Sequence, residues 1–150
     1  MEGRVSDSSR PSKARLAFKP DSDLMQLKFR RLPATFAVCR LPADAPMPTL
    51  SSTAVFISIT RTAEELSIVC PIDQAQHNPK CESPWTCFKL QGPFPFSLTG
   101  VLASFLNPLA ERGIPIFAVS TFDTDYVLVK EEDAATALET LQAAGHNLVS

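Results

Sequence analysis

A short polar stretch between two apolar runs carries the side chains of this sequence that are best suited to chemistry. Residues 120–125, STFDTD, hold hydroxyl groups and two carboxylates. The flanking runs, residues 114–119 and 126–129, are rich in Val, Ile, Phe and Tyr. That composition favours β-strands on both sides of a tight turn. The pattern therefore predicts a β-hairpin whose tip presents acidic and hydroxyl side chains.

The two acids at this tip, Asp123 and Asp125, allow two kinds of chemistry. Carboxylates two positions apart can lie on one face of a strand and act as general acid and base, with His77 as a further candidate group. In a tight turn, however, such acids usually accept hydrogen bonds from backbone N–H groups. The sequence also has no motif of nucleophilic catalysis, nucleotide binding or zinc catalysis. We therefore expect a protein that is not an enzyme, and keep a small enzyme as the less favoured alternative.

A second polar loop, FSLTG at residues 96–100, precedes the start of an expected helix. Free N–H groups at a helix N-terminus can hold a carboxylate, and Gly100 would let a ligand approach the backbone. Asp125 offers the negative charge that an ammonium group needs. Both features together suit an α-amino acid. The residues alone slightly favour the alternative, in which Ser97 only caps the helix and Asp125 only forms the turn.

Apolar residues at helical spacing predict a helix at residues 98–112 before the hairpin. Ser97 is the expected N-cap and Gly113 the residue that ends the helix. Pro108 lacks an N–H group, so we expect a kink near Ser104, four residues earlier.

A second helix is expected after the hairpin, at residues 131–144, where three acids suit the helix N-terminus. Adding a strand at residues 87–91 gives the order strand, helix, strand, strand, helix, which is most of a ferredoxin-like βαββαβ unit. The last strand comes from residues 146–149 or is borrowed from elsewhere in the chain.

The first half of the chain contains shorter elements. Strands are expected at residues 34–41, 54–60, 65–70 and 85–92, and the prolines of residues 42–49 exclude a helix there. Residues 56–73 and 117–133 share an apolar run, a Ser/Thr-rich bend, an acid, a second apolar run and a final Asp. In this internal repeat Thr60 matches Thr121 and Glu65 lies near Asp125, unless the two hairpins are unrelated.

Composition excludes several classes of function. A net charge of −2 offers no global attraction for nucleic acid or an anionic membrane. No apolar run approaches the roughly 20 residues that span a bilayer. Residues 1–23 are polar and aperiodic, which is typical of a disordered tail. Because no secretory signal is recognisable, we expect a cytoplasmic protein with reduced thiols.

Four cysteines raise the question of a metal site. Cys39 and Cys70 lie inside apolar runs and are expected to be buried thiols. Cys81 and Cys87 flank a polar loop near His77, but without a C-x-x-C pair the zinc signal is weak. We expect no metal and no other cofactor.

Three stretches carry a resemblance to a known family: FISITRTAEELSIVCPID, WTCFKLQGPFPFSLTGVLASFLNPLAERGI and IFAVSTFDTDYVLVKEED. They resemble ACT-domain proteins, and most of all the short tandem-ACT proteins related to the CASTOR arginine sensors. The resemblance covers residues 32–146. It implies an α+β fold of tandem ferredoxin-like βαββαβ modules, with antiparallel sheets and helices on one face. The modules would span residues 24–84, where the first is incomplete, and 85–150.

The resemblance also implies a function, namely a non-catalytic regulatory protein that binds a small molecule, with an amino acid as the expected ligand, at a domain or subunit interface. By motif, the ligand-binding residues would be Leu98, Thr99, Gly100, Val101, Thr121, Phe122, Thr124 and Asp125. The sensors carry four modules and this chain has room for two, so we expect a homodimer. A scaffold that oligomerises without a ligand is the main alternative.

Overall fold

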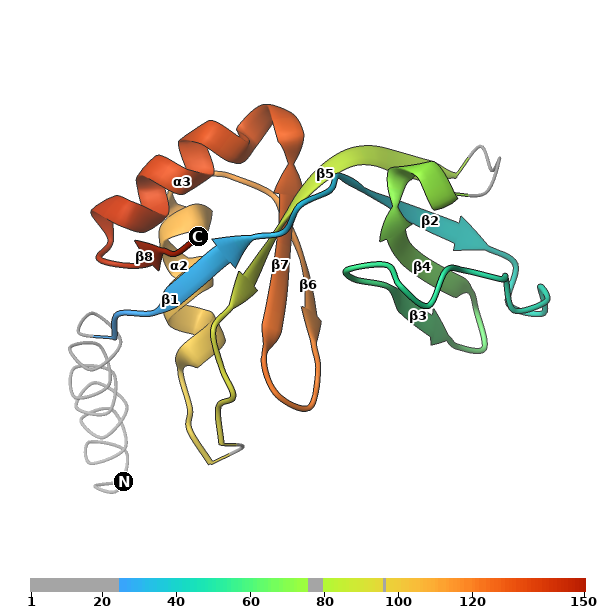
Figure 1. Cartoon of the computed structure of the whole chain (residues 1–150), viewed down its shortest axis with the longest axis horizontal. Coiled ribbons are helices and arrows are strands. Elements are labelled where there is room, and N and C mark those ends of the chain that lie inside the picture. Colours follow the sequence, from blue (N-terminus) through green and yellow to red (C-terminus); the bar gives the residue numbers. More distant parts are fainter. Residues whose placement is uncertain (1–24, 76–79, 96) are drawn as a thin grey trace, which may run out of the picture.

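A computed structural model describes residues 25–75, 80–95 and 97–150 of the chain. The expected tail at residues 1–23 and His77 lie outside the described residues. The described residues form one eight-stranded sheet and two α-helices (Figure 1). The strands are β1 (Lys28–Arg31), β2 (Phe36–Leu41), β3 (Ser58–Arg61), β4 (Leu66–Pro71), β5 (Cys81–Leu90), β6 (Ile116–Ser120), β7 (Asp125–Lys130) and β8 (Asn147–Leu148). The helices are α2 (Val101–Glu111) and α3 (Ala134–Ala143), and the short 3₁₀ turns are η1 (Ile72–Gln74) and η2 (Glu131–Asp133).

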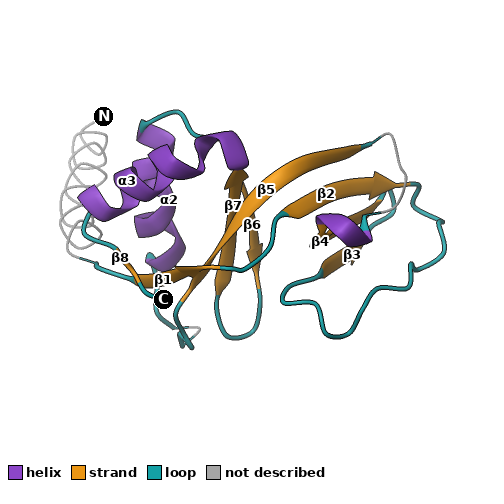
Figure 2. Cartoon of the chain, turned by 45° about the horizontal axis from the view of Figure 1, so that its top comes forward, coloured by secondary structure: helices purple, strands orange, loops and turns teal. Residues whose placement is uncertain are grey.

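Strand β5 joins the two halves of the molecule because it is ten residues long and has different neighbours at its two ends. Its first residues pair with β2, which belongs to a sheet edge of order β3-β4-β2. Its later residues lie between β1 on one side and β7 on the other, and β6 follows β7. Both α-helices lie on the β1–β5–β7–β6 half, as Figures 1 and 2 show.

The order β5, α2, β6, β7, α3 confirms the expected ferredoxin-like arrangement. The position beside β5 that a fourth strand would fill is taken by β1, which runs antiparallel to β5. The residues after α3 form only the two-residue β8, and β8 pairs in parallel with β1. The fourth strand is thus borrowed from the start of the described chain. As a result, a segment expected in the first module completes the sheet of the second.

The main core lies between the helices and one face of the sheet. Phe29 packs edge-on against Phe88 and Phe105, with ring centroids 5.5 and 5.2 Å apart, and all three side chains are fully buried. Each such side chain contributes about 1.5–3 kcal/mol through burial. Successive side chains of a strand point to opposite faces, so Cys87 lies on the other side of β5. There it joins a second cluster, which includes Phe36 of the first half.

The first half has no α-helix among its described residues, and residues 42–49 are not helical, as their prolines predict. Residues 42–57 instead run across one face of β4 without regular structure. Leu50 packs there against the buried Leu66 and Ile68. Arg61 holds this segment by donating hydrogen bonds to the carbonyl oxygens of Ala43 and Ala45, the latter at 2.7 Å.

Two expectations about this half were wrong. Cys39 is not a reduced thiol but forms a disulfide with Cys81, because the β2–β5 register places the two residues directly opposite each other. The strand expected at residues 54–60 begins only at Ser58, since the preceding residues turn to cover the core. Cys70 is a buried free thiol, as predicted, and burial raises the pKa of the other free thiol, Cys87, to about 12.

Candidate functional site

The turn between β6 and β7, residues 121–124, is held by its own two threonines. The Thr121 N–H group donates to the Thr124 carbonyl oxygen at 2.8 Å, and the Thr121 hydroxyl donates to the same oxygen at 3.0 Å. The buried Thr124 hydroxyl donates to the Leu90 carbonyl oxygen at 2.7 Å. These hydrogen bonds attach the hairpin tip to the end of β5 and fix the backbone that carries its exposed side chains.

The loop that follows β5 packs closely against this turn. The Phe94 N–H group donates to the Asp123 carbonyl oxygen at 3.0 Å. A Cβ atom at Gly92 would lie only 2.8 Å from that same oxygen, so the close approach of the two backbones requires glycine.

Helix α2 begins at Val101, three residues later than expected. Its N-cap is Gly100, whose φ of 81° is left-handed, so the helix cannot extend back through it. Ser97 is therefore not the cap, and no side chain caps this end. The first intrahelical bond runs from the Ser104 N–H group to the Gly100 carbonyl oxygen at 3.0 Å. The N–H groups before it have no acceptor within the helix.

A hollow of about 210 Å³ lies between the hairpin tip and the start of α2. It brings together six of the eight residues predicted to bind a ligand: Leu98, Val101, Thr121, Phe122, Thr124 and Asp125. Thr99 and Gly100 are adjacent in the chain but do not line it. The prediction of ligand-binding residues missed four others in its wall, namely Phe94, Pro95, Ser120 and Asp123. The G-P-F-P run that ends β5 was the available signal for the first two.

Asp125 is the charged group of this hollow that lies at the end of a strand. Its carboxylate accepts a hydrogen bond from the Ser120 hydroxyl, directly opposite on β6. Its side chain is partly buried, and it forms no ion pair with any residue in the described ranges. Because the Asp125 carboxylate has no cationic partner among these residues, it can pair with a cationic group of a ligand.

Asp123 has a different place from Asp125. It lies within the turn, whereas β7 begins at Asp125, so the two acids are not neighbours on one face of a regular strand. Both nevertheless border the hollow. Within the described residues, no group of three metal-ligating side chains occurs.

His146 is almost fully buried and joins α2 to the borrowed strand. Its Nδ1 atom accepts a hydrogen bond from the Leu27 N–H group at 3.1 Å, so Nε2 is the nitrogen that carries the proton. Nε2 donates to the Ser104 carbonyl oxygen at 3.0 Å. Pro108 has no N–H group to give that oxygen, and the imidazole supplies the missing donor. His146 is thus a structural residue that fixes α2 beside the hollow.

Comparison with known proteins places this geometry in a family. The model of the ACT domain matches residues 80–143, which contain β5, both helices and the hairpin. A second family model, described as an N-terminal domain, matches residues 34–78. The crystal structure of protein Atu0741 from Agrobacterium tumefaciens is 42% identical, with a TM-score of 0.78, over 83% of this chain and 93% of that one. The chain contains an ACT domain at residues 80–143.

Curated relatives of this ACT-domain protein include members of the CASTOR group. The human protein CASTOR3P is 27% identical over 101 residues, which cover 59% of this chain and 62% of the relative. The bovine cytosolic arginine sensor for mTORC1 subunit 1 is 26% identical over 97 residues, which cover 57% of this chain and 30% of the sensor. The chain thus spans less than two thirds of either relative. ACT domains typically bind small molecules in regulation. Neither described helix is long and apolar enough to cross a bilayer.

Proposed function

We propose that this ACT-domain protein is a non-catalytic regulator that binds an α-amino acid in the hollow between the β6–β7 turn and the start of α2. The observation that carries the proposal is the Asp125 carboxylate, which borders the hollow and has a hydroxyl partner but no cation among the described residues. A ligand ammonium group would fill that role, since hydrogen bonds between ionised partners are the stronger ones.

The other end of an amino acid finds a complementary partner across the hollow. The N–H groups in the first turn of α2 have no acceptor within the helix, and the positive end of the helix dipole favours a carboxylate there. Leu98 borders the same space and is 44% exposed, so it can contact the ligand side chain. The loop residues Thr99 and Gly100 act through backbone position rather than by lining the wall.

A second copy of the chain completes the site in this proposal. A volume of about 210 Å³ is smaller than the roughly 300–1,000 Å³ of typical ligand pockets. The named arginine sensor is more than three times as long as the segment that matches this chain. A homodimer would supply the further modules, and the expected modules, residues 24–84 and 85–150, would be its units. A cytoplasmic location agrees with the name of that sensor.

The proposal is tested by a thermal-shift screen with the twenty amino acids, because a ligand that binds only the native state raises its stability. Calorimetric titration then compares the wild type with Asp125→Asn. Loss of one member of a desolvated charge pair costs about 2–5 kcal/mol, so binding should weaken by tens- to thousands-fold. The fold should persist, because asparagine retains the hydrogen bond to Ser120.

Asp123→Asn is the comparison variant and should weaken binding less, because Asp123 borders the same hollow but lies in the exposed turn, where water screens its charge. Equal affinity of the wild type and Asp125→Asn would refute the site. A dimer that no amino acid stabilises would instead favour a scaffold without a ligand.

A further inference from the structure

Two positive charges stand directly opposite each other on the sheet. Arg30 of β1 pairs with Lys89 of β5 in the antiparallel register, so their side chains leave the same face with Cβ atoms about 5 Å apart. Like charges in this position repel each other and destabilise a sheet. Neither side chain forms an ion pair with a residue that the structure describes. The repulsion is therefore not neutralised by these parts of the protein.

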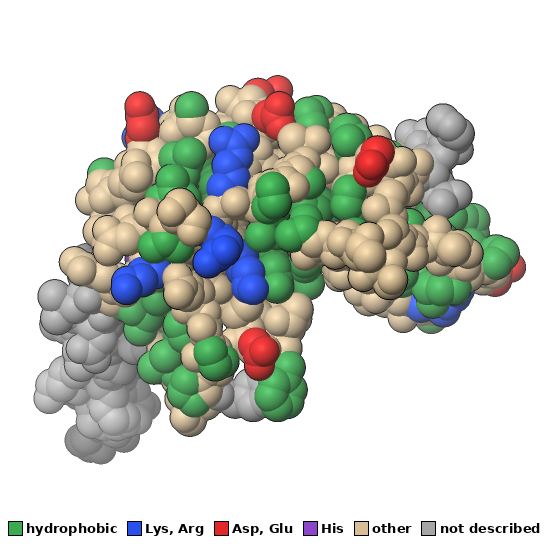
Figure 3. All heavy atoms as spheres, in the orientation of Figure 1, with side chains coloured by type: hydrophobic (Ala, Val, Ile, Leu, Met, Phe, Trp, Pro, Cys, Tyr) green, Lys and Arg blue, Asp and Glu red, His purple; other side chains and the backbone are tan. Residues whose placement is uncertain are grey.

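This face of the sheet is the one that the helices leave uncovered. Phe29, Phe88 and Val127 point under the helices, and their strand neighbours Arg30, Lys89 and Tyr126 point the other way. Figure 3 shows Lys and Arg side chains gathered at the centre of the molecule, over β1 and β5.

A hollow of about 450 Å³ lies over these side chains, within the range of small-molecule sites. Its polar wall is formed by Arg30, Lys89, Gln91, Thr121, Asp123 and Tyr126. Lys89 is oriented by Tyr126, because its Nζ atom lies 5.9 Å from the centre of that ring. Burial, followed by the charges of Cys87 and Asp123, raises the pKa of the Tyr126 hydroxyl, which keeps it protonated as a donor.

We propose that this hollow is a binding site for a small anion that carries a carboxylate or phosphate group. The planar Arg30 guanidinium can hold two oxygens of such a group, and Lys89 adds a second charge. The Tyr126 hydroxyl and the Gln91 amide are further donors, whereas the Thr121 hydroxyl already donates to the Thr124 carbonyl oxygen. Asp123 is the one acidic group in the wall, and it lies in the turn rather than on the strands that carry the two cations.

Two other basic side chains of the sheet, Lys130 and Arg40, differ from this pair in having acidic partners. Lys130, on the same strand as Tyr126, has the Glu82 carboxylate 3.2 Å from its Nζ atom. Arg40 lies 3.9 Å from the Glu65 carboxylate. Lys130 and Arg40 thus have acidic partners, whereas Arg30 and Lys89 form no ion pair with a described residue and stand opposite each other. The two hollows share the turn residues Thr121, Asp123 and Thr124, but Arg30 and Lys89 border only this one and Asp125 borders only the other.

The test uses inorganic phosphate and succinate as probes, titrated at constant ionic strength and followed by calorimetry and thermal unfolding. The wild type should bind at least one probe saturably. Arg30→Gln and Lys89→Gln should each weaken that binding by about ten- to a hundredfold. Lys130→Gln, which removes an equally basic group from the same sheet, should bind as the wild type does.

Two further readouts decide the origin of any effect. Without a probe, Lys89→Gln should unfold at the same temperature as the wild type or higher, because it removes repulsion. Asp125→Asn should bind the probe normally, whether or not the amino-acid site exists. The proposal is overturned if neither probe binds saturably, if Arg30→Gln and Lys89→Gln bind as tightly as the wild type, or if Lys130→Gln loses as much affinity as they do.

Discussion

The two hairpins of the molecule turn in the same way but lie in different surroundings. In the first, the Thr62 N–H group donates to the Glu65 carbonyl oxygen at 2.9 Å, as Thr121 does to Thr124 in the second. In both, the threonine hydroxyl also contacts that carbonyl oxygen, at 3.4 and 3.0 Å. The repeat is therefore visible in the structure, although its register differs from the one expected. Thr62, not Thr60, matches Thr121.

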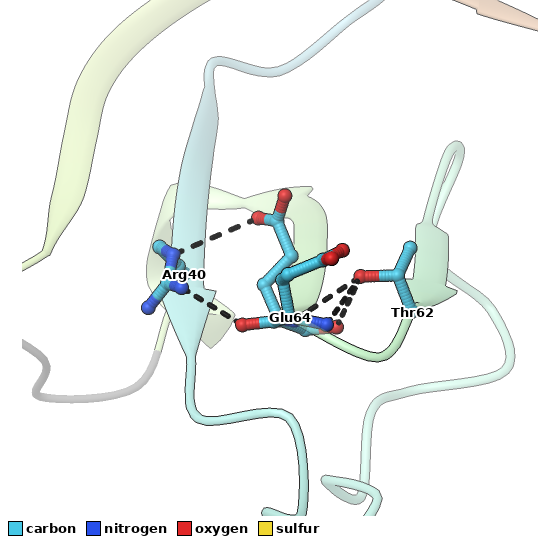
Figure 4. A network of polar contacts seen from close by, with 4 residues as sticks. Arg40, Thr62 and Glu64 are labelled. Atoms are coloured by element: carbon cyan, nitrogen blue, oxygen red, sulfur yellow. Dashed lines mark hydrogen bonds and ion pairs between the residues drawn. The ribbon is translucent and has the colours of Figure 1, made fainter.

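The difference between the hairpins lies in what faces each turn. Arg40 reaches the first turn, where it donates to the Glu64 carbonyl oxygen at 2.8 Å and lies beside the Glu65 carboxylate (Figure 4). The second turn instead faces the start of α2, and among the described residues its acid Asp125 has a hydrogen bond from the Ser120 hydroxyl but no cationic partner. One turn is thus closed by an internal cation, whereas the other leaves its charge available. On the proposed function, the turn offers its acid to a ligand because the start of a helix, and not an arginine, faces it.

The largest expected effect on stability concerns the segments that cover the sheet, a helix in the second half and an irregular segment in the first. Phe105 on α2 is fully buried, and Phe105→Ala should lower the free energy of unfolding by about 3–5 kcal/mol. Leu50 lies in the irregular cover of the first half and is only partly buried, so Leu50→Ala should cost about 1 kcal/mol. Urea unfolding measures both. Equal losses would mean that the helix-free cover is as tightly packed as the helical one.

The next effect concerns the contact that is unique to the second hairpin. Gly92→Ala places a methyl group against the Asp123 carbonyl oxygen, and displacing the turn should cost about 1–3 kcal/mol. Gly100→Ala is the control, since its Cβ would meet no atom within 4 Å and only its left-handed backbone is strained. Thermal unfolding compares the two variants. A smaller loss for Gly92→Ala than for Gly100→Ala would contradict the proposed clash.

Much of the second half could be predicted from local patterns. Alternation and β-branched residues located β6 and β7, and helical spacing located α2 and α3. The observed helices begin later than predicted because of local backbone conformation. The left-handed Gly100 precedes the first residue of α2, and residues 131–133 form the 3₁₀ turn η2 before α3. Most of the predicted site residues meet because they lie at adjacent ends of these well-predicted elements.

The rest depends on contacts between distant residues, which no local pattern encodes. Strand β1 is four residues long, and only its pairing with β5, about sixty positions later, makes it the fourth strand. The Cys39–Cys81 disulfide joins positions 42 residues apart through the β2–β5 register. The Arg30–Lys89 pair arises in the same way, so its hollow could not be foreseen from either residue.

A smaller effect should be shared by both turns. Thr62→Val and Thr121→Val keep the branched shape but remove the hydroxyl that bonds within the turn. Each should lower the free energy of unfolding by about 1 kcal/mol, the usual net worth of a hydrogen bond. Urea unfolding of both variants measures how alike the turns are. A loss confined to one of them would show that only that turn depends on its threonine.

The smallest expected effect separates a charge that holds the fold from one that is available to a ligand. Glu65 and Arg40 are both partly exposed, and ion pairs at such positions are worth about 0–1 kcal/mol. Glu65→Gln should therefore change stability little and leave amino-acid binding unchanged, because the first turn faces no helix terminus. Asp125→Asn should also spare stability but lose binding. Measuring the stability and the ligand affinity of both variants tests the contrast between the hairpins. The Glu65 carboxylate is already paired with Arg40, so it is not available to a ligand. If Glu65→Gln weakened binding as much as Asp125→Asn, the ligand would recognise both turns, and the first hairpin would belong to the site as well.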